Sequence, residues 1–146
     1  MEDYYREGVE EGVSGDPERE WGATKLLSLL GMRIVIDTRE QDPLQFRGET
    51  IVRTLLVGDY GCEINGVLTP IFFERKSLSD LYGTMTNGYE RFKREMVLAQ
   101  EWKWHLLLGI EASLSTVRQG SRFSQFHGDS CIQKLFTLWA KYQVQP

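Results

Sequence analysis

Two acids and a lysine near the middle of this 146-residue chain have the types and spacing of a site that acts on phosphate esters. Glu74 and Lys76 are two residues apart, so a β-strand would project both from one face and Arg75 from the other. The preceding residues 71–73 are Ile-Phe-Phe, which favours a buried strand. Asp59, directly after a glycine, could join the pair from a neighbouring strand end. Two carboxylates can hold a hard cation such as Mg²⁺ or Mn²⁺, and a lysine can orient water or offset phosphate charge.

Each of these three residues also has an explanation that involves no chemistry. A Gly-Asp pair such as that at Asp59 often only makes a turn, because Asp side chains bond nearby backbone N–H groups. Glu74 could form a salt bridge with a core arginine, and Lys76 could be the solvated end of a strand. We favour a catalytic role, because all three fall in register and because a carboxylate directly after an apolar segment is costly to bury unless paired or bound to metal.

Further polar residues near this constellation leave two interpretations open. Asp37 ends an apolar strand candidate and could simply cap a turn, with a local ion pair to Arg39. Alternatively, Asp37 and Glu40 could line the site formed by the acids and the lysine described above. Arg75 could form a structural salt bridge or contact phosphate. Asp80 could cap a helix or support Lys76 and Arg75 electrostatically.

Arg91, Lys93 and Arg122 are candidate contacts to a nucleic-acid backbone. Arg91 and Lys93 fall on one predicted helix, where a charged face is more often simply solvated. Arg122 ends the polar segment 118–122, and a loop of this kind is more often only a connection. The tryptophans and phenylalanines, and His105 within an apolar strand, are expected in the core.

The strands that must position these residues follow from the hydrophobic pattern. Asn65-Gly66 is a strong hairpin signal, and Pro70 predicts an irregularity, with regular pairing only from Ile71. The continuously apolar segment 104–110 is typical of a central strand covered on both faces. The remaining strands are expected at residues 33–36, 51–57, 60–64 and 67–76.

Helices are expected before, between and after these strands. Asp16-Pro17-Glu18 could cap a helix that runs to about Leu30 and that Gly31 would end. Ser77 is expected to cap the next helix, and the spacing of apolar residues predicts a third over residues 89–102. A final helix would bury one face made of Ile132, Leu135, Phe136, Trp139 and Tyr142.

The ordered set of motifs resembles the XPF-type structure-specific endonuclease domain. Its pattern is Gly-Asp, then Glu-Arg-Lys, then an Asp four residues after the lysine, and the resemblance runs from about Met32 to about Tyr142. A single Glu-x-Lys would be weak evidence, but several motifs match in order. They are Gly58-Asp59, Glu74-Arg75-Lys76, Asp80, the strand with its acidic end at Val35–Glu40, and the Arg-Phe helix at Gly88–Glu95.

This resemblance implies an α/β fold of the restriction-endonuclease-like type, with a central mixed β-sheet flanked by helices. It implies a metal-dependent DNA endonuclease that hydrolyses phosphodiester bonds in branched or flap-type DNA, in repair or recombination, using Mg²⁺ or Mn²⁺. Asp59 and Glu74 would hold the metal, with Asp37 as a third acid nearby and Lys76 beside them. Arg75, Asp80 and Glu40 would support the site, and a homodimer or heterodimer would be the assembly.

Length and composition predict one nuclease domain over residues 21–146, preceded by an acidic, disordered tail at residues 1–20. The tail carries a net charge of −6, so the remaining chain carries +2 within the total of −4. No apolar run is long enough to span a membrane, no signal peptide is evident, and the two cysteines fit neither a disulfide framework nor a metal site. We therefore expect an intracellular protein.

Two departures from the family pattern bear on function. The sequence contains no tandem helix-hairpin-helix region, and it ends where the family's nuclease domain usually continues with another strand and helix. It could therefore be a minimal stand-alone version, a fragment truncated at its C-terminus, or one half of an assembly. Three alternative hypotheses remain. The protein could be a general recombination or restriction-like nuclease, a noncatalytic DNA-binding scaffold subunit, or a binding module that acts through the acidic tail.

Overall fold

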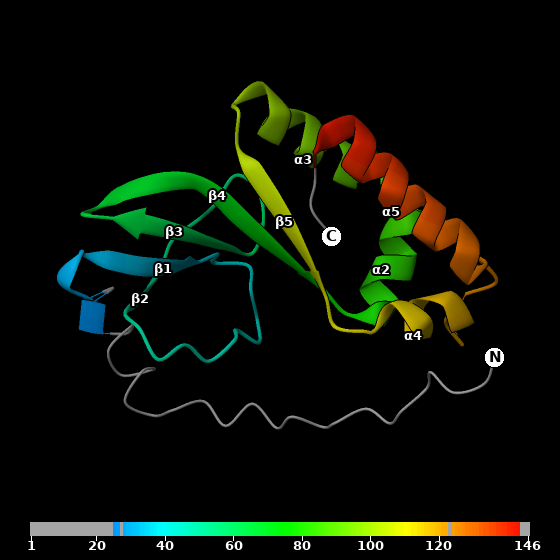
Figure 1. Ribbon diagram of the computed structural model, residues 1–146, viewed down its shortest axis with the longest axis horizontal. Helices are drawn as coiled ribbons and strands as arrows, with labels where there is room; N and C mark the ends of the chain where they lie inside the picture. The colour runs from blue at the N-terminus through cyan, green and yellow to red at the C-terminus, as the bar shows by residue number, and fades with distance from the viewer. Residues whose placement is uncertain (1–24, 27, 123, 144–146) are drawn as a thin grey trace, which may run out of the picture.

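The computed structural model describes residues 25–26, 28–122 and 124–143, in which a mixed five-stranded sheet packs against a group of helices (Figure 1). The strand order is β2-β1-β3-β4-β5, with β3 antiparallel to β1 and β4 and with parallel pairs at both sides. The elements are β1 (Met32–Ile36), β2 (Thr50–Val52), β3 (Tyr60–Ile64), β4 (Val67–Lys76), α2 (Leu78–Met85), α3 (Tyr89–Glu101), β5 (His105–Ile110), α4 (Leu114–Gln119) and α5 (Gly128–Tyr142).

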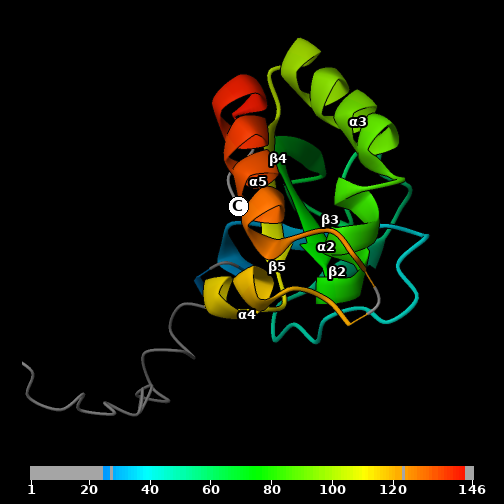
Figure 2. The same cartoon turned by 90° about the vertical axis from the view of Figure 1, so that its right-hand side faces the viewer.

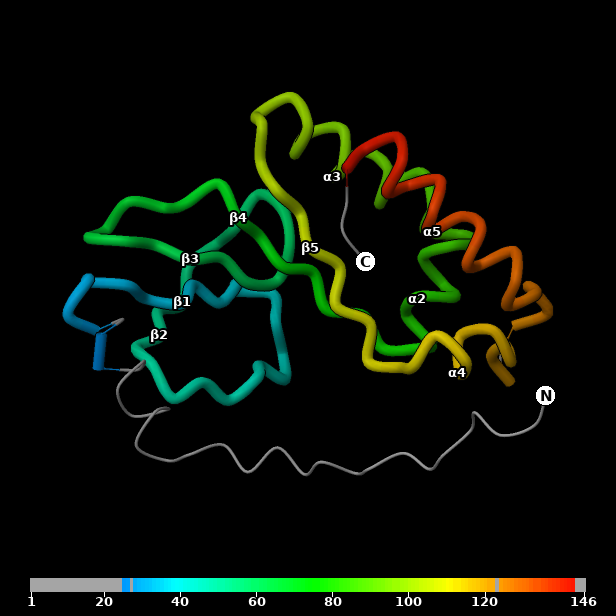
Figure 3. Tube along the Cα trace, in the orientation of Figure 1, coloured from blue at the N-terminus to red at the C-terminus, as the bar shows by residue number. Residues whose placement is uncertain are grey.

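The β3–β4 hairpin forms as predicted, and the tube in Figure 3 shows its sharp reversal. Asn65 and Gly66 both have positive φ, 51° and 80°, which suits the turn type whose twist matches that of the strands. The expected irregularity near Pro70 is confirmed. The pairing of β3 with β4 shifts register between Gly61 and Glu63, opposite the part of β4 that contains Pro70. The strand β4 nevertheless runs through Pro70 without a break.

The strand expected at residues 51–57 is wrong in length, because β2 ends at Val52. The chain then leaves the sheet to place Leu55 and Val57 in the core, where they are 3% and 1% exposed. Arg53 leads this segment, and its guanidinium lies 3.2 Å from the buried carboxylate of Glu63 on β3. Core packing and this ion pair therefore outweigh continued strand pairing.

The segment expected as a central strand is β5, which lies at the edge of the sheet in the described chain. His105 at its start is exposed, so the prediction of a core histidine is wrong as well. Leu106 and Leu108 are buried, which accounts for the apolar pattern without a second neighbouring strand.

The hydrophobic core lies between one face of the sheet and the helices, and Figure 2 shows α2, α3 and α5 grouped beside the sheet. Phe72 of β4 and Met96 of α3 are almost fully enclosed in it. The final helix buries a different face from the predicted one, because Phe136 and Trp139 are 53% and 49% exposed. Its buried positions are Gly128, Cys131, Leu135 and Leu138.

The predicted N-terminal features lie mostly outside the described residues. The acidic segment 1–20 and the cap at residues 16–18 are among those not described. The described residues at 25–26 and 28–29 are helical, and the N–H of Gly31 donates to the carbonyl of Ser28 as that turn ends. Within the part of the chain that the structure describes, no helix is both long and apolar enough to cross a membrane.

Candidate functional site

Glu74 and Lys76 lie on the same face at the end of β4, as their spacing predicts. The Lys76 Nζ lies 2.5 Å from Glu74 Oε1, and the two side chains are only 12% and 10% exposed. The same Lys76 Nζ lies over the ring of Phe92 on α3, 5.4 Å from the centroid of that ring. The strand therefore delivers a charged pair to a largely enclosed place where the sheet meets α3.

Asp59 immediately precedes β3 and is fixed to the strands on both sides. Its N–H donates to the carbonyl of Phe73, and its own carbonyl accepts from the N–H of Asp37, both at 2.8 Å. Its Oδ2 accepts the N–H of Arg75 at 2.8 Å. The other carboxylate oxygen has no partner within the described residues, so Asp59 offers one free oxygen beside the end of β4.

Burial raises the pKa of both acids. For Glu74, burial is the main cause, Lys76 opposes it, and the charges of Asp59 and Glu95 add to it. For Asp59, burial again leads, and the Arg75 N–H and Lys76 oppose it. Two carboxyl groups that resist ionisation next to one another are typical of a functional site and would favour a bound cation.

Glu95 of α3 belongs to this electrostatic environment, although the sequence motifs gave it no role. Its charge acts on both Glu74 and Arg39. Glu95 follows Phe92 by three residues, and such positions share a helix face. That spacing is the signal by which it could have been found.

Asp37 is fully engaged by the protein, with 1% of its surface exposed. Its Oδ1 accepts from the Arg39 N–H at 2.9 Å and from the Arg39 Nε at 2.6 Å, and its Oδ2 accepts from the Leu55 N–H at 2.6 Å. Burial acts to raise its pKa, but these hydrogen bonds together lower it. Asp37 thus organises the segment after β2, and both of its carboxylate oxygens accept hydrogen bonds from the protein.

The three predicted metal-binding acids are not gathered into one cluster. In residues 25–26, 28–122 and 124–143, no three His, Cys, Asp or Glu side chains are arranged to hold a metal ion. Glu74 and Asp59 remain as a pair of carboxylates with free oxygens. Such a pair fits a hard cation that keeps several of its waters.

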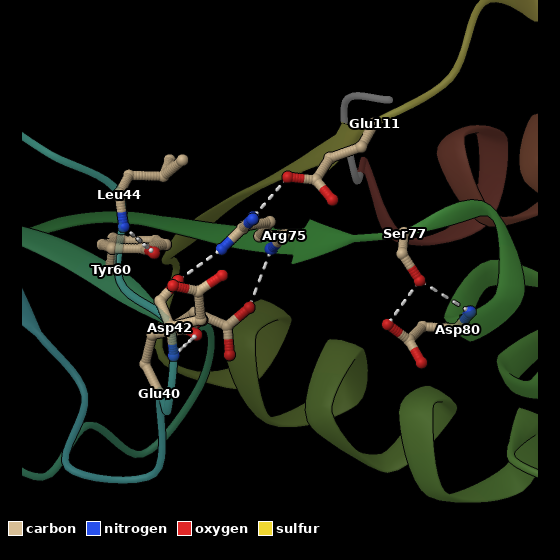
Figure 4. A network of polar contacts seen from close by, with 9 residues as sticks. Glu40, Asp42, Leu44, Tyr60, Arg75, Ser77, Asp80 and Glu111 are labelled. Atoms are coloured by element: carbon tan, nitrogen blue, oxygen red, sulfur yellow. Dashed lines mark hydrogen bonds and ion pairs between the residues drawn. The ribbon is translucent and has the colours of Figure 1, made fainter.

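Arg75 points to the face of the sheet opposite Glu74, as expected, and Figure 4 shows its contacts. Its Nε lies 2.5 Å from Glu111 Oε1, and another guanidinium nitrogen donates to the Asp42 carbonyl at 2.7 Å. Glu40 accepts the Asp42 N–H at 3.1 Å and also acts on the pKa of Asp59. Arg75 therefore links the loop after β1 to the end of β5.

Asp80 caps α2 together with Ser77, which confirms the predicted capping pair (Figure 4). Ser77 Oγ accepts the Asp80 N–H at 3.1 Å and donates to Asp80 Oδ2 at 2.6 Å. Asp80 also borders a polar groove of about 680 Å³ between α2 and α3, to which Lys76 and Arg91 contribute. The groove therefore begins beside the Glu74–Lys76 pair.

The other basic candidates lie apart from this groove lining. Lys93 forms an exposed ion pair with Glu90, one helical turn away. The Lys93 Nζ lies 3.6 Å from Glu90 Oε2. Arg122 is exposed. Among the three, Arg91 alone lines the same groove as Lys76.

The five-stranded mixed sheet with helices packed on it, and with Asp59, Glu74 and Lys76 gathered at the ends of β3 and β4, is a restriction-endonuclease-like fold. The chain belongs to the ERCC4 domain family, whose model matches residues 36–145.

Two solved structures of XPF from Aeropyrum pernix are similar to this chain. The structure in complex with DNA has 20% sequence identity and a TM-score of 0.60, and the other has 19% and 0.59. Each match covers 77% of this chain but 54% of the other, so this chain spans about half the length of those proteins. No curated protein sequence matches the chain.

Proposed function

We propose that this protein is a metal-dependent endonuclease that hydrolyses phosphodiester bonds in branched or flap-type DNA inside the cell, in repair or recombination. The observation that carries the proposal is the buried carboxylate of Glu74, 8% exposed, with a raised pKa beside Asp59 and with Lys76 at 2.5 Å. The membership of the ERCC4 domain family supports the choice of substrate class.

Glu74 and Asp59 are the residues that would hold a Mg²⁺ or Mn²⁺ ion, each through an oxygen that the described protein leaves free. When bound, the cation supplies Lewis-acid stabilisation of phosphate charge and a more acidic water. Asp37 would support this pair indirectly, because it holds the segment after β2 in place through the Leu55 N–H. Arg39 would in turn neutralise the charge of Asp37.

The protein's own groups would serve hydrolysis as follows. Lys76, held by Glu74 and Phe92, offsets the negative charge that develops on the phosphate oxygens. A water oxygen forms a bond to phosphorus while the bond from phosphorus to the 3′ oxygen breaks, and the proton released from the water ends on the 3′ oxygen. The products carry a 5′ phosphate and a 3′ hydroxyl.

The direct test is incubation of the protein with a labelled 3′-flap DNA and Mn²⁺, with an EDTA control. Glu74→Gln keeps the shape of the side chain and removes its charge, so we expect cleavage to fall about 100-fold or more. Glu101→Gln, which neutralises an exposed acid at the far end of α3, is the matched control and should cleave like the original protein.

Substrate geometry is tested by comparing linear duplex, flap and four-way junction at equal concentrations. Faster cleavage of the flap supports the proposed preference. Equal rates on all three would instead favour a general recombination or restriction-like nuclease.

A noncatalytic DNA-binding scaffold subunit is a second candidate, favoured by one observation. Asp37 already uses both carboxylate oxygens on the protein, and the described residues form no three-acid metal cluster. A scaffold needs no cation, so added Mn²⁺ should leave its melting temperature unchanged. The nuclease should be stabilised by Mn²⁺, and Glu74→Gln should lose that stabilisation.

A further inference from the structure

The groove between the end of α2 and the start of α3 carries hydrogen-bond donors that the Glu74–Lys76 site does not use. It is lined in part by Thr84 of α2 and by Asn87 and Gly88 of the connecting turn. Its volume of about 680 Å³ is in the range of small-molecule sites. Because Lys76 also borders it, anything bound there lies next to the proposed reactive centre.

Thr84 is the most informative residue of the groove. The residue is 8% exposed, and its hydroxyl makes no hydrogen bond to any described residue. Its hydroxyl oxygen is not one of the fully enclosed atoms, so it reaches the groove, whereas a helical Thr often bonds the carbonyl one turn back. The neighbouring Thr86 does so, since its hydroxyl donates to the Tyr82 carbonyl at 2.8 Å. The Thr84 hydroxyl is therefore left available to a ligand in the groove.

The first turn of α3 faces the same space through Gly88 and Arg91. α3 has thirteen residues, and among the described residues no side chain caps its N-terminus. The N–H of Tyr89 donates to the carbonyl of Thr86, whereas the N–H groups of Glu90 and Arg91 have no carbonyl partner among the described residues. These two N–H groups lie at the positive end of the helix dipole. Gly88 keeps this turn tight, because a Cβ there would lie 3.1 Å from Thr84 Cα.

Charge also favours an anion on the α3 side of the groove. Arg91 is exposed and forms no ion pair within the described residues, so its guanidinium is available. Asp80 is the acid on the lining, and its carboxylate is directed to Ser77 at the start of α2. An anion would therefore sit toward Thr84 and Arg91, away from Asp80.

We propose that this groove binds a second phosphate of the DNA strand, different from the phosphate at which the strand is cut. The Thr84 hydroxyl, the free N–H groups in the first turn of α3 and the Arg91 guanidinium would hold it. The proposal rests on the proposed function, because it takes the ligand to be a DNA strand that runs past Lys76. Holding a second phosphate there would fix which phosphodiester bond of the strand reaches Glu74 and Lys76.

The test measures binding of a fluorescent 3′-flap DNA in EDTA over a range of salt concentrations. Thr84→Val removes the hydroxyl at constant shape, and we expect Kd to rise about tenfold with no change in its salt dependence. Arg91→Gln should raise Kd and also lower the slope of log K against log salt by about 0.9. Thr84→Ser, which restores a hydroxyl, should recover most of the affinity.

Matched controls lie elsewhere on the described surface. Thr137→Val removes an exposed hydroxyl of α5 that bonds within its own helix, and Lys103→Gln removes a charge just beyond the far end of α3. Both should bind like the original protein. A scan of single methylphosphonates along the strand should reveal a position that weakens the original protein but not Thr84→Val.

The outcomes separate the groove from the nuclease. Cleavage by the original protein, together with normal binding by Thr84→Val and identical methylphosphonate profiles, overturns the groove and leaves the nuclease standing. Binding that depends on Thr84, without cleavage in any metal, supports the groove and overturns the nuclease. No binding to DNA at any salt concentration overturns both.

Discussion

At the scale of single residues, Asp37 shows how an acid near a candidate site can be needed for the fold. Its carboxylate is buried and accepts hydrogen bonds from Arg39 and from the Leu55 N–H. In Asp37→Asn, the amide can replace only part of this arrangement. We expect a loss of about 2 kcal/mol of stability at pH 7, seen as a melting temperature lower by about 4–8 °C.

The pH dependence of that loss follows from the direction of the shift. The folded-state pKa of Asp37 is lowered, so its stabilisation is present above the unfolded value of 3.8 and is lost as pH falls through the lower folded value. The difference between Asp37→Asn and the original protein should therefore shrink below about pH 4. Asp129→Asn, at an exposed site on α5, is the control, and an Asp37→Asn deficit that persists at low pH would contradict this account.

Asp59 should behave in the opposite way. Burial raises its pKa, and the charge of Glu74 lies nearby, so the ionised form costs stability in the folded protein at neutral pH. Asp59→Asn should therefore melt about 2–4 °C higher in EDTA at pH 7, for a gain near 1 kcal/mol. It should also lose cleavage and the stabilisation by Mn²⁺.

The same sign argument gives a control for the Asp59 prediction. The gain should vanish as pH falls below the range in which Asp59 of the original protein becomes protonated. The exposed Glu101→Gln at the end of α3 should leave the melting temperature unchanged. A lower melting temperature for Asp59→Asn at pH 7 would mean that its bond to the Arg75 N–H outweighs the cost of its charge.

At the scale of elements, the packing of the Phe73 ring of β4 over β5 depends on Gly109. A Cβ at this position would lie 2.0 Å from Phe73 Cζ, so the ring would have to move. We expect Gly109→Ala to lose about 1–3 kcal/mol of stability in denaturant unfolding. Adding Phe73→Leu should recover part of the loss. Gly48→Ala, where a Cβ meets nothing within 4 Å, is the control and should be close to neutral.

Signals from adjacent residues predicted individual turns and helix caps correctly, but they did not predict the features that depend on long-range contacts. The hairpin at Asn65-Gly66 and the cap at Ser77 are determined by a few adjacent residues, and both are confirmed. The early end of β2 depends on Leu55 reaching the core and on Asp37 accepting its N–H, eighteen residues away. Sequence periodicity contains neither contact.

The same distinction applies to the candidate site. Glu74 and Lys76 share a face because strand geometry requires it, and their pairing was predictable. The groove required the packing of α2 against α3, so Thr84 could not be recognised from its neighbours in sequence. The exposed position of Trp139 was missed because the apolar pattern of α5 is wider than the face that the described core covers.

At the scale of the whole molecule, an apolar surface lies over α4, α5 and the edge of the sheet. Leu114, Phe136 and Trp139 are 63%, 53% and 49% exposed, and an apolar groove of about 350 Å³ runs between Ile110 and Phe136. Within the described residues, the outer edge of β5 has no pairing strand. Large apolar patches and open strand edges are typical of association surfaces.

We therefore expect the protein to dimerise through this surface, with a copy of itself or with a related chain. Light scattering after gel filtration should give the mass of a dimer, and Trp139→Glu should give that of a monomer. Trp102→Glu, at another exposed tryptophan, is the control and should leave the dimer intact. A monomer at all concentrations of the original protein would exclude the homodimer.

The double attachment of Asp59 to its neighbouring strands also determines how the site would be lost on heating. Its N–H and carbonyl are both bonded across the sheet, to Phe73 and to the N–H of Asp37. Hydrogen–deuterium exchange of the Asp59 amide should therefore require opening of the sheet, with a free energy close to that of global unfolding. The carboxylate would then keep its position until the domain itself melts, and cation binding would disappear together with the fold.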